Sequence, residues 1–254
     1  MLYKASFLTQ CDILATDGSI GSVHDQYFDD RSWSLRYLVV DTGNWLPGRK
    51  VLIAPTAISA VDAKNDALRL DLSKQQVTES PGMSSDLPVS RQMEEQMSRH
   101  FGWPAYWDAE AAAGIIAPPM IPPFAPQEPP SPPQKDTAPP IANPNLRSVA
   151  EIRGHGISVT DGELGTVDDV IFNDGGWMIR YLVIETGTWL SGRKVLLAPS
   201  WCDSIDWSER VIRARLSRDA IESCPEFDPD VPITRDYEDA IHQHYREDTY
   251  WIDA

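Results

Sequence analysis

The chain has 254 residues, of which 42% are hydrophobic and 24% charged, which is ordinary usage for folded globular domains. Its 22 Lys plus Arg against 38 Asp plus Glu leave a formal net charge of −16, and because such a field repels phosphate backbones and anionic lipids, direct nucleic-acid and membrane-surface binding are disfavoured. The most apolar run is too short to cross a bilayer and the first residues lack the apolar core of a signal peptide, so we expect a cytoplasmic protein with no membrane span.

A gapless internal repeat with an offset of 144 residues organises the chain. Residues 17–107 align with residues 161–251, and 16 of the 23 pairs between Trp33 and Pro55 are identical. Solenoid units repeat every 20 to 50 residues or so, and this period is far longer. The repeat therefore indicates two copies of one whole domain.

Each copy contains short segments rich in Val, Ile, Leu, Tyr and Trp that are separated by turn residues, a pattern typical of antiparallel β structure. Asp17-Gly18 predicts the first hairpin turn, and Gly21 in the next strand predicts a bulge or bend. Pro55 ends the fourth strand because proline cannot donate to a ladder. We predict about six strands per copy, folded as a small antiparallel barrel. After the hairpin, the predicted strands of the first copy span residues 20–28, 33–40, 50–54, 58–62 and 67–70.

Each copy ends in a predicted amphipathic helix. Ser90 precedes Met93, Met97 and Phe101, which recur four residues apart and so share one helix face, and Thr234 occupies the equivalent position in the second copy. A barrel of about 75 residues is marginally stable by itself. We therefore expect the helix to cover its own barrel or to dock on the other copy.

Four charged residues are spaced to pair across one turn of these helices, and an aromatic pair follows each helix. The charged pairs are Arg91 with Glu94 and Arg235 with Glu238, and the aromatic pairs are Tyr106-Trp107 and Tyr250-Trp251. When exposed, such ion pairs contribute only tenths of a kcal/mol. We expect the aromatic pairs to pack within the molecule rather than against a partner.

A proline-rich segment separates the two copies. Residues 118–144 hold 12 of the 21 prolines, a composition that favours extended polyproline conformation with a reach of roughly 80 Å. A spacer is favoured over a ligand for SH3 or WW domains. The predicted organisation is a first domain at residues 1–110, a linker at 111–144 and a second domain at 145–254.

Two segments resemble the PRC-barrel family: Arg36-Tyr37-Leu38-Val39-Val40 and the run from Trp45 to Pro55, both of which recur in the second copy. The resemblance, which extends to stand-alone bacterial members, implies a compact, mostly antiparallel β-barrel used as an assembly module. Such modules occur in the photosynthetic reaction centre H subunit and in the C-terminal domain of the ribosome maturation factor RimM. This chain lacks the membrane helix of the former and the N-terminal barrel of the latter, so neither role carries over.

Residues with catalytic or metal-binding chemistry do not form a recognisable set. Cys11, Cys202 and Cys224 have no cysteine at the equivalent positions, and of the five histidines only His100 and His244 correspond. No C-x-x-C pair and no convergent zinc-ligand set is apparent. We therefore predict no catalytic residues, no metal and no cofactor.

A tryptophan followed by two cations recurs in a glycine-bounded loop. These residues are Trp45, Arg49 and Lys50 in the first copy, and Trp189, Arg193 and Lys194 in the second. Tryptophan and arginine dominate the binding energy of many protein interfaces, so the six form a possible interaction surface. Anchoring of the loop onto its own copy is the favoured alternative.

The leading functional hypothesis is a non-enzymatic protein-protein interaction or assembly scaffold, with an unknown protein partner, whose copies pair about a pseudo-twofold axis. A small-molecule or metal-dependent enzyme with its site between the copies is one alternative. A ribosome- or RNA-associated maturation factor is another, although the acidic balance speaks against direct RNA contact.

Overall fold

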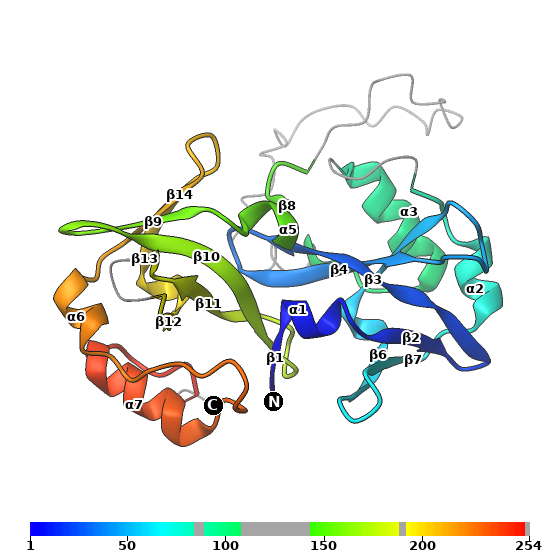
Figure 1. Ribbon diagram of the computed structural model, residues 1–254. Helices are drawn as coiled ribbons and strands as arrows, with labels where there is room; N and C mark the ends of the chain where they lie inside the picture. Colours follow the sequence, from blue (N-terminus) through cyan, green and yellow to red (C-terminus); the bar gives the residue numbers. More distant parts are fainter. Residues whose placement is uncertain (84–88, 108–142, 188–191, 252–254) are drawn as a thin grey trace, which may run out of the picture.

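The computed structural model confirms a mainly β protein with two sheets of seven strands each, lying side by side (Figure 1). It describes residues 1–83, 89–107, 143–187 and 192–251. Within these ranges no helix has both the length and the apolar character needed to cross a membrane. Nearly all of the predicted linker falls outside the described residues.

The elements of the first repeat follow the predicted order. They are β1 (Leu2–Lys4), α1 (Ala5–Leu8), β2 (Asp12–Ala15), β3 (Gly18–Asp29), β4 (Ser34–Asp41), β5 (Lys50–Ile53), the 3-10 turn η1 (Pro55–Ala57), β6 (Ile58–Asp62), β7 (Ala67–Leu70), α2 (Lys74–Glu79) and α3 (Arg91–Phe101). The three-residue β1 and the short helices α1 and α2 have no counterpart in the predicted pattern.

The second repeat contains the same series. Its elements are β8 (Leu146–Ser148), α5 (Val149–Ile152), β9 (Gly156–Val159), β10 (Gly162–Asn173), β11 (Ile179–Glu185), β12 (Lys194–Leu197), η3 (Pro199–Trp201), β13 (Cys202–Asp206), β14 (Val211–Ala214), α6 (Arg218–Glu222) and α7 (Arg235–Tyr245). The two repeats therefore match in the order of their elements as well as in their sequence.

The strand order is β5-β4-β3-β2-β7-β6 in one sheet and β12-β11-β10-β9-β14-β13 in the other. All described pairs are antiparallel except β2 with β7 and β9 with β14, which are parallel. The pairing is thus mostly antiparallel, as predicted, with one parallel pair in each sheet. The reason is that η1 and η3 replace a hairpin after the fourth strand, so the following hairpin joins the sheet from its other side.

Gly21 and Gly165 lie where the first hairpin bends, as predicted. The register of β10 against β9 shifts between Glu163 and Gly165, which marks a bulge. A Cβ on Gly165 would lie 2.0 Å from the carbonyl oxygen of Glu185, and one on Gly21 would lie 1.9 Å from the equivalent oxygen. Only glycine permits this approach of two backbones.

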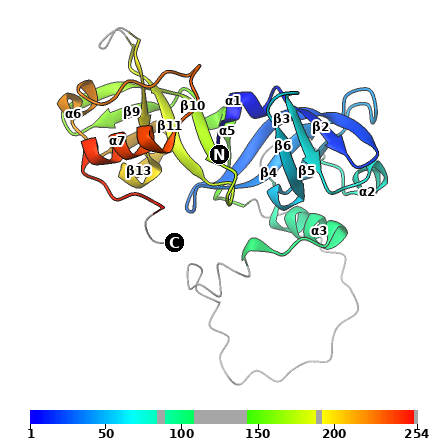
Figure 2. The ribbon, with the colours of Figure 1, turned by 90° about the horizontal axis from the view of Figure 1, so that it is seen from below.

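The predicted terminal helices begin at the predicted caps. The Ser90 hydroxyl accepts a hydrogen bond from the Met93 amide at 3.2 Å, and the Thr234 hydroxyl accepts one from the Tyr237 amide at 3.3 Å. Met97 of α3 is fully buried in a cluster with residues of β4 and β5. Each helix therefore covers the sheet of its own copy, and Figure 2 shows α3 and α7 against separate sheets.

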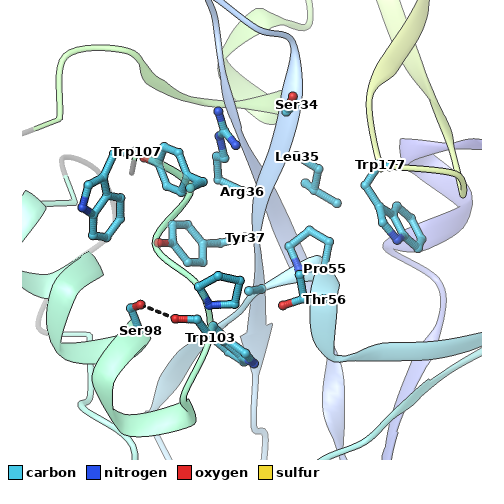
Figure 3. Close-up of a pocket in the computed structure, with 14 residues that line it drawn as sticks. Ser34, Leu35, Arg36, Tyr37, Pro55, Thr56, Ser98, Trp103, Trp107 and Trp177 are labelled. Atoms are coloured by element: carbon cyan, nitrogen blue, oxygen red, sulfur yellow. Dashed lines mark hydrogen bonds between the residues drawn. The ribbon is translucent and has the colours of Figure 1, made fainter. Parts of the chain in front are cut away.

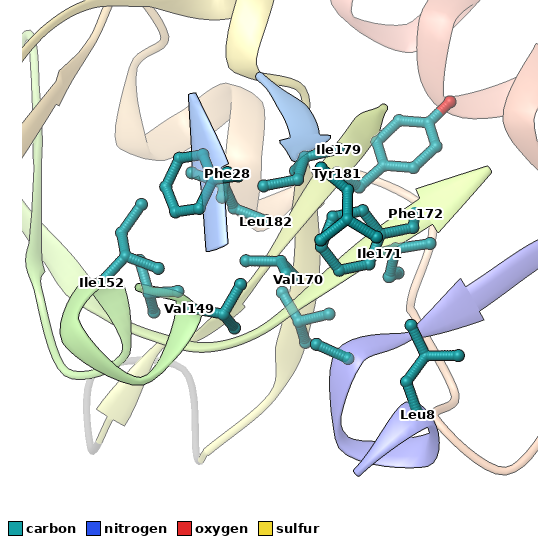
Figure 4. Packing of buried hydrophobic residues seen from close by; sticks show 14 of the residues in the cluster. Leu8, Phe28, Val149, Ile152, Val170, Ile171, Phe172, Ile179, Tyr181 and Leu182 are labelled. Atoms are coloured by element: carbon teal, nitrogen blue, oxygen red, sulfur yellow. The ribbon is translucent and has the colours of Figure 1, made fainter. Parts of the chain in front are cut away.

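The main hydrophobic core draws side chains from both repeats. Phe28 of β3 lies among Val149 and Ile152 of α5 and Leu182 of β11 (Figure 4). All four side chains are almost completely buried. The two sheets therefore share one core instead of packing as independent units.

We expect Gly165→Ala to destabilise the protein by about 3 kcal/mol, because a methyl group forced against backbone cannot be relieved by a rotamer change. Gly21→Ala should cost at least as much, since Gly21 also has a φ of +135°. Gly175→Ala is the control, because its nearest neighbour would be the Asn173 side chain at 3.8 Å. Chemical denaturation gives the three values, and a wild-type midpoint for Gly165→Ala would contradict the close approach.

Candidate functional site at the junction of the two copies

The first strand of each repeat pairs with the sheet of the other repeat. β1 lies antiparallel to β10 with Tyr3 opposite Phe172, and β8 lies antiparallel to β3 with Arg147 opposite Phe28. With the offset of 144 residues, Tyr3 corresponds to Arg147 and Phe28 to Phe172, so the two pairs are equivalent. Each repeat thus supplies one strand to its neighbour and receives one in return, at the centre of Figure 1.

A second contact joins two residues that are equivalent to each other. Ser34 and Met178 form an isolated antiparallel bridge, and the amides that follow them donate to the carbonyls of Trp177 and Trp33 at 2.8 and 2.7 Å. Trp33 and Trp177 have φ angles of 57° and 54°. For non-glycine residues this conformation costs on the order of 1 kcal/mol each, so the junction holds both tryptophans in a strained backbone.

Two carboxylates, the half-buried Asp25 and the buried Asp169, fasten the exchanged segments. Asp25 of β3 accepts hydrogen bonds from the Ser148 hydroxyl and, at 3.3 Å, from the Ala150 amide. In the other direction, Asp169 of β10 accepts one from the Ser6 amide at 3.2 Å. Burial raises the pKa of Asp25, and the hydrogen bonds from the exchanged segment oppose that rise.

One cluster at the junction has no equivalent in the other half. Asp30 accepts hydrogen bonds from Arg147 Nε at 3.3 Å and from Trp207 Nε1 at 2.8 Å, and the Arg147 guanidinium lies 4.4 Å from the centre of the Trp207 ring. Burial raises the pKa of Asp30 despite these donors. The edge of the fully buried His155 contacts the same indole, and burial together with the nearby Arg210 charge lowers the pKa of His155.

The carboxylate of Glu94 is fully buried beneath α3. It accepts hydrogen bonds from the Tyr106 hydroxyl at 2.6 Å and from Asn143 Nδ2 at 3.1 Å, and lies 3.3 Å from the Arg91 guanidinium. Burial raises the pKa of Glu94, which these partners oppose. The predicted pairing of Glu94 with Arg91 is confirmed. The contribution of only tenths of a kcal/mol that holds for an exposed pair does not apply here, because the carboxylate is buried.

Glu238 of α7 forms the corresponding cluster in the second copy. It accepts hydrogen bonds from the Tyr181 hydroxyl at 3.0 Å and the Tyr250 hydroxyl at 2.7 Å, and pairs with Arg235 at 3.1 Å. The Tyr181 hydroxyl also lies 3.0 Å from His242 Nε2. The predicted packing of the aromatic pairs within the molecule is confirmed at both tyrosines.

Two cavities flank the junction at equivalent positions. The first, about 260 Å³, is lined by Trp103 of the first copy and Trp177 of the second (Figure 3). The second, about 600 Å³, is lined by Arg180 and Tyr250 of the second copy and Trp33 of the first. Each cavity is therefore walled partly by the strained tryptophan of the opposite copy.

Four of the six residues of the predicted interaction surface contact groups of their own copy. The partners are the carbonyls of Thr78 and Ser80 for Arg49, those of Glu222 and Cys224 for Arg193, His24 for Lys50 and Asp168 for Lys194. Both arginines thereby bind the C-terminal end of the short helix of the same copy, α2 or α6.

The structure describes one of the two tryptophans of this predicted surface. Trp45 is half-buried against the core, and the Lys74 ammonium lies 5.4 Å from the centre of its ring. Trp189 lies outside the described residues. A role for the six residues in binding a partner stays a prediction.

The thiols are reduced and disfavour the thiolate form. Burial raises the pKa of Cys11 to about 11 and that of Cys202 to about 12, and it raises the pKa of Cys224 as well. In the described parts of the chain, no three His, Cys, Asp or Glu side chains are grouped so that they could hold a metal ion.

We expect Glu94→Ala to cost about 3 kcal/mol, because it leaves Asn143 and Arg91 without their buried acceptor. Glu94→Gln should cost less. Because the folded pKa of Glu94 is raised, its contribution to stability is complete below about pH 4.3 and is lost as the pH rises through the folded pKa. The glutamine variant should lack that loss, whereas Glu95→Gln, at an exposed pair with Arg99, should retain it. Unfolding curves between pH 4 and 8 measure the difference, and parallel profiles for wild type and Glu94→Gln would contradict it.

The comparisons with known proteins agree with the repeat. The family model of the PRC-barrel domain matches residues 2–77 and residues 148–219, together more than half of the chain. The search among curated proteins gave no match. The two matched regions contain the equivalent strand series β2 to β7 and β9 to β14. The chain therefore belongs to the PRC-barrel domain family, which it contains as two tandem copies.

Proposed function

We propose that this protein is a non-enzymatic assembly scaffold in which two PRC-barrel copies form a covalent pseudo-twofold dimer. The observation that carries the proposal is the reciprocal exchange of β1 and β8, whose residue pairs interconvert under the 144-residue offset. Domains on one chain move relative to each other by default unless a large apolar interface joins them. Exchanged strands and a shared core supply such an interface, so the copies hold their outer faces at a fixed separation, which is what a scaffold requires.

The hydrogen-bonded carboxylates at the junction and beneath α3 support a structural role. Asp25, Asp30 and Glu94 each accept at least two hydrogen bonds from neighbouring groups. A site for general acid-base catalysis between the copies needs carboxylates that converge on a common space. These three instead fasten separate contacts, which favours the scaffold over the enzyme alternative. The net charge of −16 likewise gives no support to direct RNA binding.

The pseudo-twofold packing is tested by the variant Ser34→Cys combined with Met178→Cys. The hydrogen bonds on either side of this bridge make it a non-hydrogen-bonded pair, whose Cα atoms lie about 4.5 Å apart and suit a disulfide. We expect quantitative formation of this disulfide on mild oxidation. Because it closes a long loop, it should raise the free energy of unfolding by roughly 2–4 kcal/mol.

Each single cysteine variant is the control for this cross-link, since it carries a new thiol without its partner. Peptide mapping under non-reducing conditions identifies the bond and separates it from exchange with the native Cys11, Cys202 or Cys224. Failure to form the bond, or formation only between two chains, would contradict the proposed packing.

The scaffold role is tested by capture of the full-length protein from its own cells, followed by reconstitution of each captured protein with the purified chain. We expect at least one protein to bind directly in a stoichiometric complex, and the oxidised cross-linked variant to bind it equally well, because a scaffold needs no opening of its junction. Loss of that partner on cross-linking, or turnover of a metabolite by the purified chain with no direct partner, would refute the role.

A further inference from the structure

The two junction cavities have diverged although they occupy equivalent positions. In the first, Trp103 stacks on Phe101 with ring centres 4.2 Å apart and fills part of the space. The equivalent residue in the second copy is Glu247, whose carboxylate is held by Arg215 at 3.3 Å. The second cavity is consequently more than twice as large, about 600 Å³ against about 260 Å³.

The larger cavity presents polar groups that lack partners. The Arg180 guanidinium lies 4.0 Å above the centre of the Tyr250 ring, and its Nε is buried with no hydrogen-bond acceptor among the described residues. The same holds for the buried Thr249 hydroxyl oxygen. The neighbouring carboxylate, Glu238, is already paired with Arg235. Buried donors without acceptors are costly, so these groups are suited to a ligand that supplies an acceptor.

The rest of the lining defines the body of such a ligand. Trp33, Ile179 and Pro199 contribute apolar surface on the walls around Arg180. A volume of this size lies within the range of about 300–1,000 Å³ that is usual for sites that bind small molecules. A guanidinium next to apolar walls matches an organic molecule with one planar anionic group.

The charges around the cavity limit the ligand to a single negative charge. Arg180 and the exposed Arg31 are the cations of the lining, and Glu247 and Asp248 are its carboxylates. Since Glu247 is paired with Arg215, the exposed Asp248 remains to repel an anion at the rim. Together with the net charge of −16, this disfavours phosphate dianions and polyanions.

We infer that the larger junction cavity is a binding site for a small organic monocarboxylate with an apolar, ring-containing body. The carboxylate accepts hydrogen bonds from Arg180 and Thr249, while the ring lies between Tyr250 and the strained Trp33 of the opposite copy. This site goes beyond the scaffold proposal, because it adds a binding site for a small metabolite at the junction of the two copies.

The test uses the full-length protein and naphthoate as the probe, with the neutral naphthamide of the same shape as its control and naphthyl phosphate as the dianion. Isothermal titration calorimetry gives the affinities. We expect naphthoate to bind one site per chain. The amide should bind about tenfold or more weakly because it loses a charge-assisted hydrogen bond, and the phosphate should also bind more weakly because Asp248 and the net charge of −16 repel its second charge.

Three variants address the site and one serves as the matched control. Arg180→Gln should weaken naphthoate about tenfold or more, Thr249→Val should weaken it severalfold, and Glu247→Trp should abolish binding by installing the side chain that occupies the smaller cavity. Arg36→Gln, at the position equivalent to Arg180 in the first copy, should leave binding unchanged. Thr249→Val replaces the hydroxyl by a methyl group of similar size, so it keeps the test decisive if Arg180→Gln fails to fold.

The inference is overturned if naphthoate shows no saturable binding, if naphthamide binds equally well, or if Arg36→Gln has the same effect as Arg180→Gln. Tighter binding of naphthyl phosphate would also overturn it in favour of a phosphate site. None of these results bears on the cross-link between positions 34 and 178, so failure of the ligand site and failure of the scaffold packing are distinguishable.

Discussion

Backbone pairing along the far halves of β3 and β10 is the constraint on which the rest of the molecule depends. Each strand is 12 residues long, yet the preceding strand of its own copy, β2 or β9, pairs only with its beginning, residues 18–22 in β3 and 162–166 in β10. Beyond the bulge, the same edge would expose unpaired amides and carbonyls. The exchanged strands β8 and β1 cover residues 27–29 and 171–173, so each sheet is completed only by the other copy.

The position of the half-buried Asp25 follows from this arrangement. Asp25 lies in the gap between the part of β3 that pairs with β2 and the part that pairs with β8, where the ladder is interrupted and incoming amides need acceptors. Its hydrogen bonds to Ser148 and Ala150 fill that gap. These donors belong to the other repeat and add to the hydrogen bond from the Gln26 amide at 2.8 Å, so the cost of desolvating Asp25 is offset more fully when the copies are together. The hydrogen bonds of Asp25 therefore link the interruption of the β3 ladder to the association of the two halves.

Features governed by neighbouring residues could be predicted from the sequence, and features governed by distant ones could not. The bend at Gly21 and the cap at Ser90 depend on a few adjacent positions, and the structure confirms both. The strand exchange left no such trace, because two copies of similar sequence can pair within or between themselves with the same residue types. The buried Glu94 cluster had one usable indicator, namely that Glu94, its arginine and its tyrosine all recur in the second copy at the same spacing.

Tandem copies can differ at equivalent positions, which a homodimer of one sequence cannot do. The exchanged strands and the strained conformation of Trp33 and Trp177 are kept in both halves. The differences include the cluster around Asp30, which occurs in one half, and the two cavities, where Glu247 replaces a tryptophan and His242 replaces a serine. If the cavities served only packing, both would be expected to stay filled, since unfilled volume lowers stability. The exchanged strands therefore form a symmetric framework, and the side chains that line the two cavities differ within it.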